Sequence, residues 1–163
     1  MYRVAIITSS DSGYEGKRED KSGPEIERIV KSHGFEVVHK VILPDEREML
    51  SAEMKRIADE DIADLILTTG GTGFSKRDWT PEATMDIAER IVPGIPEAMR
   101  AFSMQITKRA MLSRATAAIR KETLIINMPG SPKAVDECIG YIVSELNHGL
   151  QILKGTATNC ARK

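Results

Sequence analysis

Two short and almost wholly apolar segments constrain the fold of this chain most. Residues 4–8 and residues 65–69 consist of Val, Ala, Ile and Leu followed by Thr. Continuous apolar runs of this length are typical of strands that are buried on both faces of a parallel sheet. Parallel strands need long crossover connections, which are usually helices, so the sequence predicts an α/β fold.

Strand and helix patterns alternate along the rest of the chain. Further strands are predicted at 35–43, 114–119 and 123–128, and helices are predicted to start near Ser22, Asp45, Thr80, Glu97 and Val135. Ser22 with Glu25 has the spacing of a capping box, while Asp45, Thr80 and Ser131 are suitable N-caps. Only three residues separate the last two strands, which predicts a hairpin and one antiparallel strand.

The predicted architecture is a three-layer α/β/α sandwich, mostly parallel with one antiparallel strand, in a single domain over residues 1–163. In open sheets of this kind, ligands bind outside the carboxyl ends of the strands. Four segments of this chain should meet at that edge: residues 9–20, 44–45, 70–80 and 129–133.

Composition excludes several classes of function. The net charge of −1 argues against broad nucleic-acid binding, and no apolar run approaches the roughly 20 residues that span a bilayer. The chain shows no signal peptide, and Cys138 and Cys160 stand alone, as in a reducing cytosol, so we expect a cytoplasmic protein. The histidines, His33, His39 and His148, lack metal-ligand or triad spacing, which rejects a zinc site or a histidine-based hydrolase.

The segment Gly70-Gly71-Thr72-Gly73 is the most informative stretch for chemistry. Three glycines in four residues leave backbone N–H groups uncovered, and such a nest binds phosphate or another anion. Lys76 and Arg77 add positive charge nearby. The alternative is a tight turn with surface charges. The segment is not a Walker loop, because it lacks that spacing.

Asp45 and Asp78 are the candidate metal ligands. Each follows a predicted strand and precedes a predicted helix, so both should lie at the same edge of the sheet. One or two carboxylates near bound phosphates are what Mg²⁺ requires. The alternative for each residue is a helix cap.

Other polar residues at this edge are candidates for binding. Ser9, Asp20 and Ser22 belong to the connection after the first strand, where turn and cap roles are the alternative. Ser131 and Lys133 stand at a helix N-terminus, itself an anion site. A lysine in a first helical turn is unfavourable for the helix dipole, which favours a bound anion there. Arg109 and Arg114 flank residues 111–113 and serve either a phosphate or the solvated surface.

Several motifs in one order resemble the molybdopterin adenylyltransferases of the MogA/MoaB type. The resemblance covers nearly the whole chain. Its parts are residues 67–73, Arg77-Asp78, Thr80-Pro81-Glu82-Ala83-Thr84, Leu43-Pro44-Asp45-Glu46, Pro93-Gly94, Ser113-Arg114-Ala115, residues 129–134 and Asp20-x-Ser22-Gly23. A lone Gly-Gly-Thr-Gly is weak evidence, but this series is specific.

The resemblance implies an activity and a set of roles. The family transfers AMP from ATP to the phosphate of molybdopterin, releases pyrophosphate, and passes the product to a molybdate-insertion protein. It implies Mg²⁺ as the cofactor, Asp45 and Asp78 as the functional aspartates, and a homotrimer. Pterin- and nucleotide-binding loops map onto residues 70–73 and onto Ser131 and Lys133.

One alternative within the resemblance is a trimeric pterin carrier of the MoaB-type branch without transfer activity. Arg77-Asp78 and the intact motif at residues 80–84 favour the adenylyltransferase branch. Trp79 departs from the family pattern, where a smaller apolar residue is expected.

Overall fold

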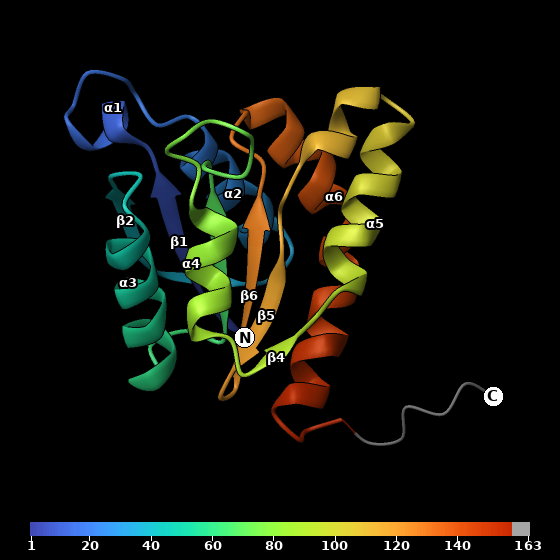
Figure 1. The fold of residues 1–163 in the computed structure, drawn as a ribbon. Helices are drawn as coiled ribbons and strands as arrows, with labels where there is room; N and C mark the ends of the chain where they lie inside the picture. Colours follow the sequence, from blue (N-terminus) through green and yellow to red (C-terminus); the bar gives the residue numbers. More distant parts are fainter. Residues whose placement is uncertain (158–163) are drawn as a thin grey trace.

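A six-stranded sheet forms the centre of the molecule in the computed structural model, which describes residues 1–157 (Figure 1). The spatial order is β2-β1-β3-β6-β5-β4. The strands are β1 (Arg3–Ser9), β2 (Glu36–Leu43), β3 (Leu65–Thr69), β4 (Arg90–Ile91), β5 (Ala117–Arg120) and β6 (Thr123–Met128). β2, β1, β3 and β6 pair in parallel, whereas β5 runs antiparallel to both of its neighbours. This confirms the mostly parallel sheet with one antiparallel strand.

Helices cover both faces of the sheet, which confirms the three layers. α2 (Ser22–Ser32), α5 (Gly94–Met104) and α6 (Pro132–Leu153) lie on one face, and α3 (Arg47–Asp59) and α4 (Thr80–Ile87) lie on the other. Successive residues of β1 point into different cores: Val4 and Ile6 pack towards α2 and α6, while Ala5 and Ile7 pack towards α3 and α4. The strand is therefore buried on both faces, as its apolar run predicts.

The predicted helix caps are partly wrong. Ser131 does cap α6, since its hydroxyl accepts from the amide of Ala134 at 3.2 Å. Ser22 and Thr80, in contrast, are the first residues of their helices, and the residue at the N-cap of α3 is Glu46 instead of Asp45. The side chains of Ser22, Thr80 and Asp45 bond to other segments, so they are unavailable as caps.

Other boundaries also differ from the prediction. The helix predicted over 97–111 is split into α5 and a 3-10 helix, η1 (Lys108–Leu112). The strand predicted from Arg114 starts three residues later, because the backbone of Arg114 bonds to Thr72 instead of to the sheet. The short helix α1 (Asp11–Tyr14) and the two-residue strand β4 have no counterpart in the prediction.

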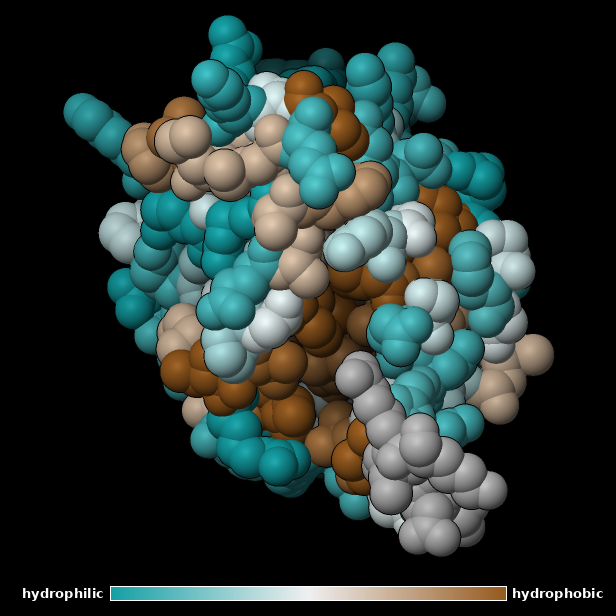
Figure 2. Space-filling model, turned by 90° about the vertical axis from the view of Figure 1, so that its right-hand side faces the viewer, coloured by the Kyte–Doolittle hydropathy of each residue, from teal (hydrophilic) through white to brown (hydrophobic). Residues whose placement is uncertain are grey.

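The face formed by α5 and α6 carries an apolar hollow (Figure 2). On the same side of the sheet, Val92, Ile95 and Leu153 are half-buried against the core, and Tyr141 of α6 is 52% exposed. Among the helices of residues 1–157, none combines the length and apolarity needed to cross a membrane. Cys138 is a buried free thiol, as predicted, while Cys160 lies outside the described residues.

Candidate functional site

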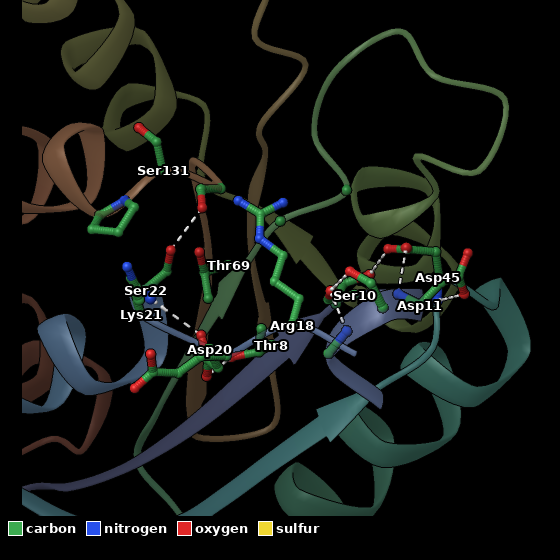
Figure 3. A pocket seen from close by; sticks show the side chains of 18 of the residues that line it. Thr8, Ser10, Asp11, Arg18, Asp20, Lys21, Ser22, Asp45, Thr69 and Ser131 are labelled. Carbon is green, nitrogen blue, oxygen red and sulfur yellow. Dashed lines mark hydrogen bonds between the residues drawn. The ribbon is translucent and has the colours of Figure 1, made fainter. Parts of the chain in front are cut away.

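A cavity of about 850 Å³ opens at the carboxyl ends of the parallel strands (Figure 3). Its walls come from the connections that follow β1, β2, β3 and β6, which are the four segments that the sequence places at this edge. Eight of the predicted site residues line it: Ser9, Asp20, Ser22, Asp45, Gly70, Gly71, Asp78 and Ser131.

Gly70 and Gly71 form a turn that favours glycine strongly. Their φ angles are +89° and +69°. A Cβ on Gly70 would lie 2.4 Å from the carbonyl oxygen of Ser9, and one on Gly71 would lie 2.4 Å from Oγ1 of Thr80. Thr80 in turn donates its hydroxyl to the carbonyl of Gly70 at 2.9 Å. The turn is thus pressed against both neighbouring segments, with no room for a side chain.

Asp45, which lines the cavity, is fixed by three hydrogen bonds. Its Oδ1 accepts from the hydroxyl of Ser9 at 2.5 Å, and its Oδ2 accepts from the backbone amide of Asp11 at 3.0 Å. The amide of Asp45 donates back to Oδ1 of Asp11 at 3.0 Å. The helix-cap alternative for Asp45 therefore does not hold, because its carboxylate serves the β1 connection instead of α3.

Asp78 is carried by a loop that a half-buried arginine supports. Oδ2 of Asp78 accepts from the amide of Ser75 at 2.9 Å, and Oδ1 accepts no hydrogen bond from the described residues. Arg114 donates to the carbonyls of Gly73 at 2.7 Å and of Asp78 at 2.8 Å, and it pairs with Glu82. Arg114 thus supports the loop at both ends instead of facing the cavity or solvent.

Arg77 does not reach into the cavity as a free cation. It binds Asp11 through Nε at 2.6 Å and Nη2 at 3.0 Å, and Glu46 through Nη2 at 2.8 Å. This pairing holds the pKa of the Asp11 carboxyl below its ordinary value. The neighbouring Trp79, which departs from the family pattern, lies outside the cavity lining, with the guanidinium of Arg47 5.6 Å from its ring centre.

Asp20 organises the opposite end of the cavity. It accepts from the hydroxyl of Thr8 at 2.8 Å and from the amides of Ser22 and Gly23 at 3.1 and 3.0 Å. Asp20 is thus the group that satisfies the N-terminus of α2. Ser22 is free to donate its hydroxyl to the carbonyl of Gly130 at 2.6 Å, which ties this end to the β6–α6 connection.

Three predicted site residues do not line this cavity. Lys133 is exposed and lines neither cavity described here, while Thr72 and Gly73 line a second cavity of about 320 Å³. That cavity lies against α5, η1 and the start of α6, with Met99, Leu112 and Cys138 in its largely apolar wall. Arg109 lines it as well, and burial raises the pKa of the Cys138 thiol.

Sequence reasoning missed several residues of the first cavity. Arg18 and Lys21 add positive charge, and Thr8 and Thr69 add hydroxyl groups. In Figure 3 the guanidinium of Arg18 extends across the cavity from the β1–α2 connection. Arginine in a polar loop is ordinary for a solvated surface, so composition carries no signal for it.

The carboxylates of the cavity fit a magnesium ion only together with substrate oxygens. In residues 1–157 no group of three or more His, Cys, Asp or Glu side chains is arranged to hold a metal. Mg²⁺ characteristically takes one or two carboxylates, keeps several waters and shares substrate phosphates. Asp45 and Asp78, on one cavity and with Oδ1 of Asp78 open, match that donor set.

Known proteins match this chain in sequence. A family model described as a probable molybdopterin binding domain matches residues 5–148. The molybdopterin adenylyltransferase of Helicobacter pylori strain J99 is 35% identical over 154 residues, 93% of this chain and 88% of that protein. The molybdopterin adenylyltransferase of Escherichia coli K12 is 39% identical over 140 residues, 84% of this chain and 71% of that protein.

Solved structures match the fold equally well. The molybdopterin biosynthesis enzyme MoaB from Thermus thermophilus is 42% identical with a TM-score of 0.90, covering 95% of this chain and 98% of that one. The tungsten cofactor synthesizing protein MoaB from Pyrococcus furiosus is 36% identical with a TM-score of 0.84, covering 94% and 98%. This chain therefore belongs to the molybdopterin-binding family that includes the molybdopterin adenylyltransferases.

Proposed function

We propose that this protein is a molybdopterin adenylyltransferase. A phosphate oxygen of molybdopterin attacks the α-phosphorus of ATP, a new P–O bond forms, and the bond to pyrophosphate breaks. The products are adenylyl-molybdopterin and pyrophosphate. The observation that carries the proposal is the meeting of Asp45, Asp78 and the Gly70-Gly71 turn in one cavity, since phosphate transfer needs positioning and charge neutralisation above all.

Asp45 and Asp78 would hold Mg²⁺, which supplies neutralisation of charge on the phosphate oxygens. The hydrogen bonds from Ser9 and from the amide of Asp11 keep the carboxylate of Asp45 in one orientation. The open Oδ1 of Asp78 is available as the second ligand. The two aspartates would thus hold the cation within this cavity.

The other end of the cavity suits anions. The N-termini of α2 and α6 meet there, and Arg18 and Lys21 add positive side chains. The dipoles of both helices favour an anion at this end. Asp20 also lies at this end and already accepts from the amides of Ser22 and Gly23, so Arg18 and Lys21 are the side chains that would bind a phosphate there.

The second cavity offers a place for a flat ring. Its wall is largely apolar, and it adjoins the first cavity through Thr72 and Gly73, which follow the Gly70-Gly71 turn directly. Ligand pockets of this character hold apolar or aromatic groups, with a few polar side chains fixing their orientation. It would take the ring system of one substrate while the polar cavity takes the phosphates.

Anaerobic incubation with molybdopterin, ATP and Mg²⁺, followed by chromatography, tests the proposal. Product that requires both ATP and Mg²⁺ is the expected result. Tight pterin binding without product would favour the alternative, a non-catalytic pterin carrier. Absence of both binding and product would refute both functions.

The assembly and location belong to the same proposal. We propose a cytoplasmic homotrimer that passes its product to a molybdate-insertion protein. The apolar hollow on the face of α5 and α6 supports self-association, because contiguous exposed apolar surface is characteristic of interfaces (Figure 2). Sedimentation velocity should give the mass of three 18.0-kDa chains, and a monomer at micromolar concentration would contradict the trimer.

A further inference from the structure

Hydrogen bonds connect one candidate metal ligand, Asp45, to the residue that precedes the other, Asp78, although the two come from different loops. Asp45 follows β2, and Asp78 follows the Gly70-Gly71 turn after β3. No hydrogen bond joins the two side chains in the described residues. Asp11 and Arg77 stand between them: Asp11 bonds to Asp45, Arg77 bonds to Asp11, and Arg77 immediately precedes Asp78 in the chain.

The link between Asp11 and Asp45 is reciprocal. Each backbone amide donates to the carboxylate of the other residue, and both distances are 3.0 Å. Two bonds between two residues fix orientation as well as separation. Any movement of Asp11 therefore shifts both the backbone and the carboxylate of Asp45.

The link between Asp11 and Arg77 is bidentate. Nε and Nη2 of Arg77 bind the two carboxylate oxygens of Asp11 at 2.6 and 3.0 Å. The side chains of Arg77 and Asp11 are 51% and 38% exposed, so the pair contributes little to the stability of the whole fold. Its paired geometry nonetheless defines where residue 77, and with it the Asp78 loop, lies relative to the β1 connection.

We propose that Asp11 and Arg77 are positioning residues that set the separation of Asp45 and Asp78. This inference rests on the proposed function and deepens it. Nε and Nη2 of Arg77 both donate to carboxylates, so we assign Arg77 the role of fixing the loop and not that of binding phosphate. A displacement of about 1 Å in a reacting group costs roughly 100-fold in rate, so the Asp11–Arg77 pair should affect turnover.

Asp11→Asn and Arg77→Gln, alone and combined, test the pair. Asparagine at position 11 keeps an oxygen for the amide of Asp45 but loses the charge that holds Arg77. We expect each single variant to lower kcat about 10-fold with KM for the pterin within about twofold of wild type. The double variant should be no worse than either single one, because both remove the same link.

Two control variants separate this effect from a general loss of charge. Arg28 binds Glu25 through Nε and Nη2, as Arg77 binds Asp11, and it is 62% exposed on α2. Arg28→Gln should leave kcat unchanged. Arg77→Lys keeps the charge without the bidentate geometry, so partial rescue of kcat is expected.

Limited proteolysis tests whether the Asp78 loop is displaced, and it needs no substrate of the enzyme. Phe74 is 71% exposed in that loop, so chymotrypsin should cleave after it faster in both single variants than in wild type or Arg28→Gln. Unchanged cleavage together with wild-type kcat, or additive losses in the double variant, would overturn the positioning role. If wild type forms no product, the proposed function fails, and the cleavage rates still decide the role of the pair.

Discussion

The hydroxyl of Ser9 donates to Oδ1 of Asp45 at 2.5 Å, joining the ends of two neighbouring parallel strands. Ser9 is the last residue of β1 and pairs in register with Leu43, two residues before Asp45. The bond therefore depends on the sheet register as well as on the two side chains. This hydrogen bond fixes the position of Oδ1 in the Asp45 carboxylate.

Ser9→Ala should lower turnover while the protein stays folded. A hydrogen bond to a charged group contributes about 1.5–3 kcal/mol, so we expect kcat to fall at least 10-fold. Ser9→Thr should retain part of the activity. Ser144→Ala is the matched control, because within residues 1–157 the hydroxyl of Ser144 on α6 bonds only to the neighbouring Glu145. Equal kcat in Ser9→Ala and the control would separate this hydroxyl from the reaction.

Replacement of Asp78 should abolish transfer but spare pterin binding. Asp78→Asn keeps an oxygen for the amide of Ser75 and removes the charge, so the loop should keep its shape. We expect kcat to fall about 100-fold or more, since the carboxylate proposed to hold Mg²⁺ is lost. Asp136→Asn, at an exposed position on α6, is the control. Retained turnover in Asp78→Asn would exclude a catalytic role.

Most of the residues that the sequence predicts for the site line one cavity, because the direction of the parallel strands brings them to one edge of the sheet. Parallel strands bring their carboxyl ends to one edge, so Asp45 and Asp78 meet there whatever their side chains do. Side-chain partners are harder to predict. Ser22 has the spacing of a capping residue, but its hydroxyl donates to the carbonyl of Gly130. Asp20, two residues earlier, therefore accepts the hydrogen bonds from the first amides of α2.

Charge alone misleads for the arginines of the site. The sequence predicts that Arg77 adds positive charge beside an anion-binding turn. In the structure, the guanidinium of Arg77 instead forms ion pairs with Asp11 and Glu46, which lie in distant segments of the chain. The simplest prediction for Arg114 is a position on the solvated surface. The strand that follows it starts only at Ala117, however, and the side chain of Arg114 bonds to the Asp78 loop. Such pairings depend on tertiary contacts that no local pattern encodes.

Alanine at position 70 should disrupt the cavity, while alanine in a helix should not. The new Cβ would meet the backbone oxygen of Ser9 at 2.4 Å with φ at +89°, so Gly70→Ala should cost about 3 kcal/mol in free energy of unfolding. Beyond its own stretch of α6, no atom of residues 1–157 lies within 4 Å of the Cβ position of Gly140, and Gly140→Ala should stabilise by about 0.5–1 kcal/mol. Urea unfolding measures both. A neutral Gly70→Ala would mean that the turn relaxes freely.

Loss of Arg114 should destabilise the loop and the fold together. Arg114→Ala removes two bonds to backbone carbonyls and the ion pair with Glu82, whose Oε2 is buried with no hydrogen-bond partner in residues 1–157. We expect a loss of about 2 kcal/mol in unfolding free energy. Adding Glu82→Gln to Arg114→Ala should recover part of it, because the unpaired charge disappears. Lack of recovery would show that the carbonyl contacts alone carry the effect.

Acid stability should depend on Asp64, which lies at the end of the sheet remote from the cavity. Burial raises the pKa of this carboxyl, but hydrogen bonds from the side chain and amide of Arg3 and from Lys154 outweigh it and lower the pKa to about 2. The folded pKa is below the unfolded value of about 3.9, so the stabilisation is fully present above pH ~4 and is lost as pH falls towards 2. Asp64→Asn should therefore lower the unfolding free energy at neutral pH and flatten its decline between about pH 4 and pH 2. The exposed Asp136→Asn should leave the wild-type slope intact, so parallel curves for wild type and Asp64→Asn would assign the acid sensitivity to other carboxylates.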